Sequence, residues 1–266
     1  MPEIKSFAVG PDTSLNVNIS GNHGPTLIFL HFWGGSTRTY SQVISKLSLD
    51  FCCIAIDFPG WGSSTGPQSP DAYSITQLAI VIESLIPRLE IGDFTLVGHS
   101  MGGKVAQLIT GRRLVKGLKG VVLVAPAPPT PLVLPADMKE QQLSAYSSPQ
   151  SAEFVARNVL SSTKLDDETI AMLVEDMTRG NEFAKAAWPN YAMAEDIVEV
   201  AKKIDVPILV IAGELDKVET LDRVKKEVLC NVNGAEIVVV LGSGHLLPVE
   251  APGEVSSLVR EFVEKL

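Results

Sequence analysis

Short apolar runs alternate with amphipathic segments of helical length along this 266-residue chain, and this alternation constrains the fold more than any other feature. Six runs have the length and composition of buried strands: 26–31, 51–57, 94–98, 119–125, 206–213 and 235–241. Five other segments place apolar residues at helical spacing: 39–48, 74–90, 101–112, 220–229 and 250–265. Repeated strand–helix–strand units of this kind predict an α/β fold whose mostly parallel sheet is flanked by helices.

The remaining segments complete the predicted architecture. Segments 4–9 and 15–19 have a less buried pattern, and we expect them to pair as antiparallel edge strands, which makes the sheet eight-stranded. The alternation then stops at a Pro-rich connector, PAPPTPLVLP, which leads into residues with helical periodicity and no strand-like run. We expect a helical cap at 126–200, inserted into a core formed by 1–125 and 201–266. The alternative is a set of solvated helices that make no contact with substrate.

The charge balance, the apolar stretches and the cysteine content limit which molecules the protein can bind and where it can act. Lys and Arg number 22 against 31 Asp and Glu, which gives a net charge of −9, and no dense basic patch offsets it to attract a nucleic acid. No stretch approaches the roughly 18 apolar residues of a membrane span, and we recognise no signal peptide. Three cysteines are too few for a disulfide framework, and we expect Cys52 and Cys53 to be buried thiols. These features predict a cytoplasmic protein that acts on a small molecule, with its oligomeric state left open.

The pattern Gly-x-Ser-x-Gly occurs twice, and its context separates a nucleophile from a loop. At 62–66 it is surrounded by proline and glycine and predicts a loop. At 98–102 it follows an apolar run and opens a helical segment, the strand–turn–helix arrangement that presents a serine nucleophile. The glycines at both ends of that motif leave room for a sharp turn, and the N-terminus of the new helix favours negative charge near Ser100.

Five segments, in order along nearly the whole chain, resemble the α/β-hydrolase fold family and its serine esterase and lactonase branch. They are LHFWGGS at 30–36, DFPGWGSS at 57–64, GHSMGG at 98–103, GELD at 213–216 and GSGH at 242–245. The resemblance implies a triad of serine, histidine and an acid, together with an oxyanion hole made of backbone N–H groups.

A serine hydroxyl needs a general base near neutral pH, and the chain has four histidines as candidates. His23 lies in a turn before a strand and is expected to be solvated. His99 adjoins Ser100, but neighbouring side chains on such a turn point apart. The resemblance implies that His31 braces loops, and that the base is His245, which lies in a Gly-rich loop after the last predicted strand.

The resemblance places the triad acid just after the strand predicted at 206–213. Asp216 matches that position, and Glu214, two residues earlier, is a rival carboxylate. The acid would fix the tautomer of the histidine and stabilise its charged form. The chain order Ser100, Asp216, His245 fits the family.

Two backbone N–H groups, those of Met101 and Trp33, are expected to form the oxyanion hole. The family commonly has glycine where this chain has Phe32, and this departure makes Phe32 a poorer donor than Trp33. Phe32, Trp188 and Tyr191 are candidate residues of the substrate pocket, the last two because they lie where the cap returns to the core.

The same residues argue against several reaction classes. Ser100 stands where the dehalogenase and epoxide-hydrolase branches use aspartate, and Gly34 weighs against perhydrolases, which often carry proline there. No His-x-His-x-Asp-His cluster predicts a metal site, and no Gly-x-Gly-x-x-Gly segment or P-loop predicts a nucleotide cofactor. We therefore expect neither a metal nor a cofactor, and acyl transfer to water as the reaction.

The resulting prediction is a serine carboxylesterase that hydrolyses small to medium uncharged esters through an acyl-enzyme. The alternative is a lactonase of the same fold that opens N-acyl homoserine lactones, because the segment HFWGGS resembles the oxyanion loops of such enzymes. A third candidate is a ligand-binding relative with slow turnover. The presence of every element of the triad disfavours that third candidate.

Overall fold

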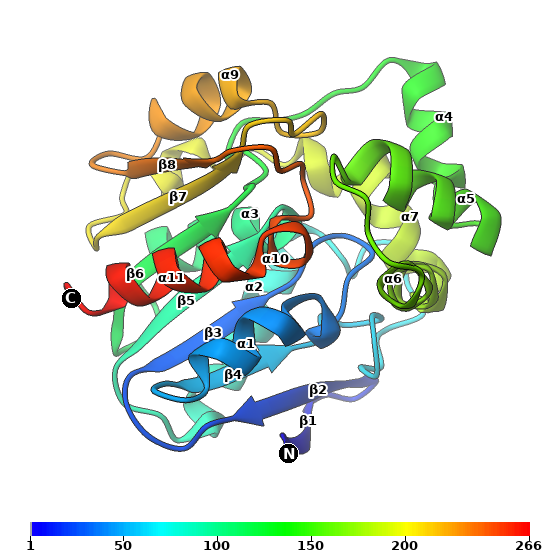
Figure 1. Ribbon diagram of the computed structural model, residues 1–266. Coiled ribbons are helices and arrows are strands. Elements are labelled where there is room, and N and C mark those ends of the chain that lie inside the picture. The colour runs from blue at the N-terminus through cyan, green and yellow to red at the C-terminus, as the bar shows by residue number, and fades with distance from the viewer. Residues whose placement is uncertain (1) are drawn as a thin grey trace.

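The computed structural model describes residues 2–266, whose strands form one eight-stranded sheet (Figure 1). The strands are β1 (Glu3–Gly10), β2 (Thr13–Ser20), β3 (Thr26–Leu30), β4 (Cys52–Ile56), β5 (Phe94–His99), β6 (Leu118–Val124), β7 (Ile208–Gly213) and β8 (Glu236–Val240). Their order across the sheet is β1-β2-β4-β3-β5-β6-β7-β8. Strand β2 is antiparallel to both β1 and β4, and the other neighbours are parallel. The predicted α/β sheet with an antiparallel edge is confirmed.

The helices follow the predicted segments, with interruptions. They are α1 (Ser41–Leu47), α2 (Ile75–Leu85), α3 (Met101–Arg112), α4 (Ala136–Ser144), α5 (Pro149–Val155), α6 (Asp167–Arg179), α7 (Glu182–Asn190), α8 (Val198–Ala201), α9 (Leu221–Arg223), α10 (Leu247–Glu250) and α11 (Pro252–Val263). Single turns of 3₁₀ or π type are η1 (Thr37–Tyr40), η2 (Ile86–Leu89), η3 (Ala156–Leu160), η4 (Ala192–Ala194) and η5 (Val224–Leu229). Two expected helices divide at Pro87 and Pro252, because proline has no N–H to donate and fits only the start of a helix.

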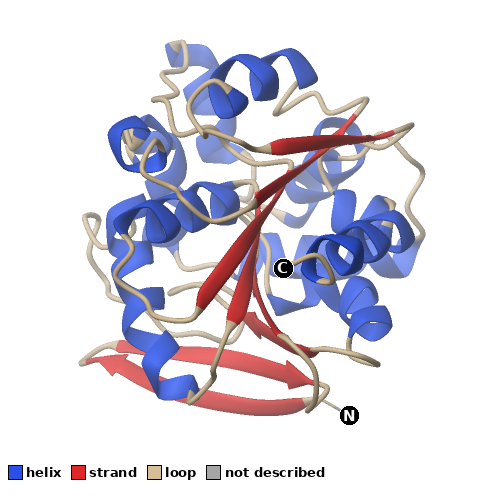
Figure 2. Ribbon diagram, turned by 90° about the vertical axis from the view of Figure 1, so that its left-hand side faces the viewer, coloured by secondary structure: helices blue, strands red, loops and turns tan. Residues whose placement is uncertain are grey.

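Each face of the sheet has its own buried cluster, because successive side chains of a strand point to opposite faces. Ile28 packs with α2 and α3 on one face, and Phe29 packs with α1 and α11 on the other. Figure 2 shows helices on both sides of the sheet. Cys53 is buried as expected. Cys52 is only half-buried, which corrects the prediction, because it begins β4 and points to the face opposite Cys53.

Between β6 and β7 the chain forms α4 to α8, of which α4 to α7 lie together at the right of Figure 1. Within the described chain, no strand occurs at 126–200. Helix α6 buries Leu173 and Met177 in the larger core cluster, whereas α4 buries no side chain. The insertion is therefore helical and packed on the core, and its division from the core at 126 and 200 stays a prediction.

The parallel strands bring three loops to one edge of the sheet. Ser100 follows β5, Asp216 follows β7 and His245 follows β8. Because parallel strands end on the same side, residues far apart in the sequence meet there, and ligands of open α/β sheets bind at that edge.

Candidate active site

The turn between β5 and α3 holds Ser100 in a backbone conformation that few residues other than glycine adopt, with φ 52° and ψ −115°. A Cβ on Gly98 would lie 2.4 Å from the carbonyl oxygen of Gly102. A Cβ on Gly102 would lie 2.4 Å from the carbonyl oxygen of Leu30. Both glycines are therefore needed for the turn, and the strain at Ser100 is of the kind that functional sites maintain.

Ser100, His245 and Asp216 form one hydrogen-bonded chain. The Ser100 hydroxyl donates to Nε2 of His245 at 2.9 Å, and Nδ1–H of His245 donates to Oδ2 of Asp216 at 2.8 Å. All three are buried: Ser100 is 7% exposed, His245 is 2% exposed and Asp216 is 5% exposed. In this arrangement the ring can take the proton of the hydroxyl while the carboxylate holds the ring in place.

Electrostatics reinforce the contact between His245 and Asp216. Burial by itself lowers the pKa of His245, but the charge and the hydrogen bond of Asp216 outweigh burial, so this pKa lies above its ordinary value. Burial by itself raises the pKa of Asp216, but the charge of His245 and the hydrogen bonds to the carboxylate bring it below its ordinary value. Asp216 is therefore a carboxylate at neutral pH, and it keeps a proton on Nδ1 of His245.

The structure also separates the two candidate acids. Oδ1 of Asp216 accepts from the backbone N–H groups two and three residues further on, at 2.8 and 2.9 Å, which leaves Oδ2 for His245. Glu214 is exposed, and its Oε2 accepts from the N–H of Gly242 at 2.8 Å. Of the two carboxylates, Asp216 is the one that contacts His245.

Two other histidines occupy the positions expected for non-catalytic residues. His31 is buried, its Nδ1–H donates to the carbonyl oxygen of Phe32 at 2.7 Å, and its Nε2 accepts from the N–H of Phe58 at 3.0 Å. Burial lowers the pKa of His31, which favours the neutral ring that this pair of bonds requires. His31 thus joins the loops after β3 and β4, whereas His23 is exposed.

His99 has a role that the sequence did not reveal. Its Nε2–H donates to the carbonyl oxygen of His245 at 2.8 Å, and the two ring centroids lie 5.3 Å apart. Burial, and then the charge of His245, lower the pKa of His99 to about 3. His99 is therefore a neutral ring that supports the backbone of His245. The sequence offered no signal for this contact, because it joins segments 146 positions apart.

The loop after β3 is fixed by aromatic packing and by the insertion. Trp33 packs on Tyr146 with ring centroids 4.2 Å apart, its carbonyl oxygen accepts from the Tyr146 hydroxyl at 2.9 Å, and its Nε1–H donates to the carbonyl oxygen of Lys185 at 3.1 Å. Gly34 has φ 95°, and a Cβ there would collide with the Tyr146 ring. Met101 begins α3, where the N–H has no partner within the helix. The donor roles of Trp33 and Met101 stay predictions.

The second Gly-x-Ser-x-Gly segment surrounds a carboxylate and presents no nucleophile. The carboxylate of Asp57 accepts from the N–H of Ser63 at 2.8 Å and from the N–H of Thr37 at 2.6 Å. The hydroxyl of Ser64 donates to the carbonyl oxygen of Asp57 at 2.7 Å. The segment at 62–66 is a loop, as expected, and its serines organise the turn after β4.

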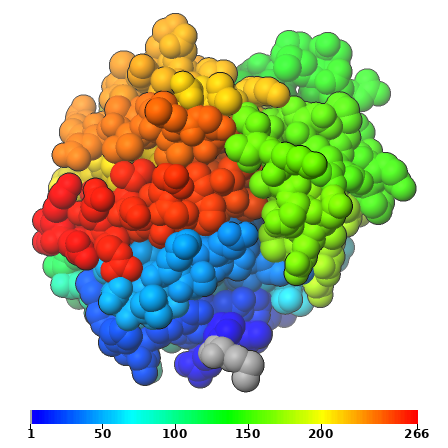
Figure 3. Space-filling view, viewed as in Figure 1, coloured from blue at the N-terminus to red at the C-terminus, as the bar shows by residue number. Residues whose placement is uncertain are grey.

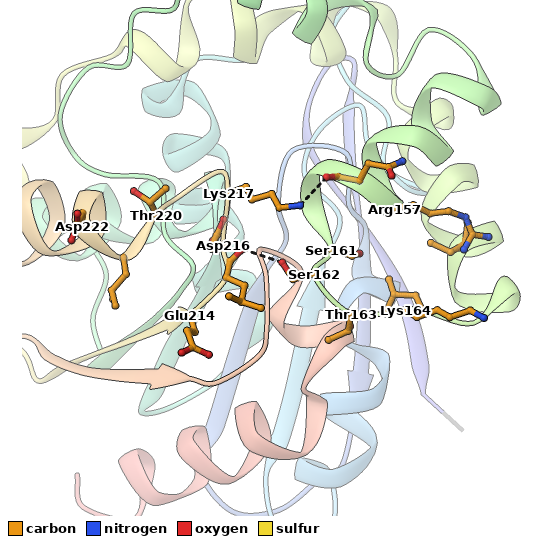
Figure 4. A pocket seen from close by; sticks show the side chains of 15 residues that line it. Arg157, Ser161, Ser162, Thr163, Lys164, Glu214, Asp216, Lys217, Thr220 and Asp222 are labelled. Carbon is orange, nitrogen blue, oxygen red and sulfur yellow. Dashed lines mark hydrogen bonds between the residues drawn. The ribbon is translucent and has the colours of Figure 1, made fainter.

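A cleft of about 990 Å³ lies beside the acid, between the insertion and the loop after β7 (Figure 4). Asp216 is part of its wall. Charged side chains also line it, namely Arg157, Lys164, Glu214, Lys217 and Asp222. The cleft therefore differs in character from the aromatic pocket that the sequence predicts.

The three residues expected to line the substrate pocket lie outside this cleft. Phe32 and Trp188 are buried in the larger core cluster. Tyr191 is half-buried, and its hydroxyl accepts from the N–H of Tyr73 at 3.2 Å. Their contact with substrate stays a prediction.

Two carboxylates near the base were not predicted. Glu219 is 3% exposed and pairs with Arg223 at 3.1 Å, and burial raises the pKa of Glu219 to about 7. Glu250 is half-buried and accepts hydrogen bonds from the backbone on both sides of His245. No motif marks either residue. The available signal was their position, three residues after Asp216 and five after His245.

Within residues 2–266, no group of three or more His, Cys, Asp or Glu side chains is arranged to hold a metal ion. In that same part of the chain, no helix combines the length and the apolar character needed to cross a membrane.

Comparison with known proteins agrees with this fold. A family model described as "Alpha/beta hydrolase family" matches residues 27–258. Two curated relatives are the non-heme chloroperoxidase CPO-A1 of Kitasatospora aureofaciens, 26% identical over 91% of this chain and 92% of the relative, and 3-oxoadipate enol-lactonase 2 of Acinetobacter baylyi, 24% identical over 98% and 97%. A solved esterase from Exiguobacterium antarcticum has a TM-score of 0.85 at 19% identity, covering 95% of this chain and 96% of the esterase. The chain belongs to the alpha/beta hydrolase family.

Proposed function

We propose that the protein is a serine hydrolase of carboxylic esters, with Ser100 as the nucleophile, His245 as the general base and Asp216 as the acid that orients the base. The observation that carries the proposal is the pair of hydrogen bonds, 2.9 and 2.8 Å long, that links the three side chains in that order. The strained turn at Ser100 and the buried carboxylate of Asp216 support the same assignment.

The proposed reaction has two halves. In the first, Nε2 of His245 accepts the hydroxyl proton as Oγ of Ser100 attacks the ester carbonyl carbon. The N–H groups of Met101 and Trp33 donate to the oxyanion that forms. His245 then gives the proton to the departing alkoxide, which leaves an acyl group on Ser100.

In the second half, water attacks the acyl group while His245 again accepts a proton. The proton returns to Oγ of Ser100, and the carboxylic acid is released. Asp216 remains ionised throughout and keeps Nδ1 of His245 protonated, so that Nε2 is the nitrogen that exchanges protons.

The proposed substrates are small to medium uncharged esters. The aromatic side chains of Phe32, Trp188 and Tyr191 are proposed to contact the acyl or aryl group, and the helices at 126–200 are proposed to cover it. Large aromatic side chains of this kind favour contact with apolar groups.

A lactonase is the second candidate. The observation in its favour is the relative named 3-oxoadipate enol-lactonase 2, which aligns over 98% of this chain. A lactone is an internal ester, so the same steps at Ser100 would open it, with the leaving alkoxide still attached to the acyl group. N-acyl homoserine lactones are the lactones proposed for this site.

The test is a hydrolysis panel on the purified protein. It compares p-nitrophenyl esters of increasing acyl length with N-acyl homoserine lactones, and Ser100→Ala is the blank. Rapid turnover of the aryl esters that depends on Ser100, with inert lactones, supports the esterase. Opening of lactones at equal or higher kcat/KM supports the lactonase, and no turnover of either class supports a ligand-binding protein.

A further inference from the structure

Glu250, the last residue of α10, joins two segments that are distant in the sequence. Its Oε2 accepts from the N–H of Ser162 at 2.8 Å, and from the N–H and the hydroxyl of Thr163 at 3.0 and 3.1 Å. The same oxygen accepts from the N–H of Gly244 at 3.1 Å, and Oε1 accepts from the N–H of Leu246 at 3.1 Å. One carboxylate therefore binds the insertion and both neighbours of His245.

Residues 160–163, which we call the strap, make further contacts with the loops of the site. The carbonyl oxygen of Leu160 accepts from the N–H of His245 at 2.9 Å and from that of Leu246 at 3.2 Å. The hydroxyl of Ser162 donates to the carbonyl oxygen of Leu215 at 3.0 Å. Figure 3 shows the green insertion lying directly against the orange and red C-terminal part of the chain. The strap thus contacts the loops of both the base and the acid.

The contact has little tolerance for change. A Cβ on Gly244 would lie 2.7 Å from Oγ of Ser162 and 3.0 Å from Oε1 of Glu250. Four backbone N–H groups converge on the carboxylate of Glu250. If the carboxylate were removed, those of Ser162, Thr163 and Gly244 would lose this acceptor, whereas that of Leu246 would keep the carbonyl oxygen of Leu160. Hydrogen bonds to a charged acceptor are stronger than neutral ones, so the carboxylate contributes more to this contact than a neutral side chain would.

We propose that Glu250 is a positioning residue that couples the strap to the base, so that a shift of the insertion moves His245 relative to Ser100. The inference rests on the proposed role of His245 as the base. Glu250 acts through the backbone N–H groups of Gly244 and Leu246. Because these residues flank His245, the two hydrogen bonds fix the position and orientation of its imidazole ring. A movement of the strap is then transmitted directly to the nitrogen that receives the proton of Ser100.

Glu250 also acts on the base through its charge. The groups that face His245 are the carboxylates of Asp216, Glu219 and Glu250, which raise its pKa, and the buried ring of His99. Removal of one negative charge lowers the pKa of His245. The acidic limb of the kcat/KM profile, where the base becomes protonated, then moves to lower pH.

Two substitutions separate the effect of the length of the Glu250 side chain from the effect of its charge. Glu250→Gln removes the charge and replaces one acceptor oxygen by an amide, so kcat should fall by about 10- to 100-fold, with KM within about threefold and the acidic limb at lower pH. Glu250→Asp keeps the charge but shortens the side chain, so kcat should fall while the acidic limb stays in place. Glu254→Gln, an exposed neighbour on α11, is the matched control and should behave as wild type.

Amide hydrogen exchange tests the coupling without substrate. In the wild-type protein the amides of Ser162, Thr163, Gly244 and Leu246 should be protected, and in Glu250→Asp all four should exchange faster together. If Glu250→Gln does not fold, as judged by circular dichroism, the coupling is tested by the kinetics of Glu250→Asp and by comparing its amide exchange with that of the wild-type protein.

The coupling is overturned if Glu250→Gln has the kcat and the acidic limb of the wild-type protein. It is also overturned if, in Glu250→Asp, the amides of the strap lose protection from exchange while those of Gly244 and Leu246 keep it. These outcomes differ from failure of the proposed function. A wild-type protein that hydrolyses none of the panel but protects the four amides together contradicts the role of His245, not the link made by Glu250.

Discussion

Nε2–H of His99 donates to the carbonyl oxygen of His245 at 2.8 Å, so one buried histidine supports the backbone of another. His99 ends β5 and immediately precedes Ser100. The strand that presents the proposed nucleophile therefore also holds the loop of the proposed base. This shared support keeps Oγ of Ser100 and Nε2 of His245 within hydrogen-bond distance. Glu250 and the strap hold the same loop from the side of the insertion.

The first prediction concerns the stability of the protein in acid. Burial lowers the pKa of His99 to about 3 in the folded state, whereas an unfolded histidine has a pKa of about 6.5. Between these values the unfolded chain binds more protons than the folded one. The contribution of this residue to the free energy of unfolding is therefore fully present above about pH 6.5, and it falls by up to about 1.4 kcal/mol per pH unit as the pH drops toward 3.

His99→Gln keeps a side-chain donor and removes the titrating group, so it should flatten this dependence. Urea denaturation at a series of pH values measures it, with His23→Gln at the surface as the control. Equal slopes for the two variants would show that His99 is not the group responsible.

The second prediction tests the nucleophile and the base together. Ser100→Ala removes one oxygen from a site that is otherwise unchanged, so it should lower kcat by at least about 10³-fold and leave the thermal unfolding midpoint near that of wild type. His245→Ala should cause a similar loss, and the double variant should be no worse, because the two side chains act as a unit. Retention of more than a few per cent of activity by either single variant contradicts the assignment.

The third prediction separates the two carboxylates after β7. Asp216→Asn removes the charge that raises the pKa of His245. Two backbone N–H groups hold the amide oxygen, so the NH₂ group faces Nδ1 of His245 and favours the wrong tautomer of the ring, and kcat should fall by about 10²- to 10⁴-fold. The acidic limb of the remaining activity should move to lower pH. Glu214→Gln changes an exposed side chain that contacts Gly242, so its kcat should lie within about twofold of wild type. A larger loss from Glu214→Gln would make Glu214 the acid.

Features set by local sterics and by periodicity were predictable from the sequence. The glycines at 98 and 102 mark the turn at Ser100 because any other residue there would collide with the backbone. The strands were predictable because buried parallel strands are continuous apolar runs. The resemblance to the α/β-hydrolase family then placed Asp216 after β7 and His245 after β8, at the edge of the sheet where Ser100 lies.

Features that depend on how distant segments pack were not predictable. Glu250 bonds to the backbone of Ser162 and Thr163, and His99 bonds to that of His245, all far away in the chain. A hydrogen bond to a backbone N–H or carbonyl group leaves no pattern of residue types. The expected substrate contacts illustrate the same limit. The position of Tyr191 depends on how α7 packs on the core, and its hydroxyl is bonded to the backbone of Tyr73. The polar cleft beside Asp216 likewise follows from the packing of the insertion.

The last prediction concerns the two segments that join the insertion to the core, one around Thr130 and one around Met193, which we call the connectors. Lys104 of α3 is buried, and its Nζ donates to the carbonyl oxygens of Thr130 and Met193, at 3.1 Å in each case. Thr130 lies before α4 and Met193 lies after α7, so one side chain joins the start and the end of the insertion to the helix that follows Ser100. Burial lowers the pKa of Lys104 to about 8, so the ammonium group still predominates at pH 7.

Lys104→Met fills a similar volume but leaves both carbonyl oxygens without this donor, which should lower the free energy of unfolding by about 2 kcal/mol. Both connectors should also open more often, so limited proteolysis should cut near 126–135 faster than in wild type. Lys226→Met, at an exposed position of η5, is the matched control for loss of a lysine charge. Mass spectrometry of the fragments identifies the cut site. If Lys104→Met and Lys226→Met are cut there at the same rate, Lys104 does not hold the connectors.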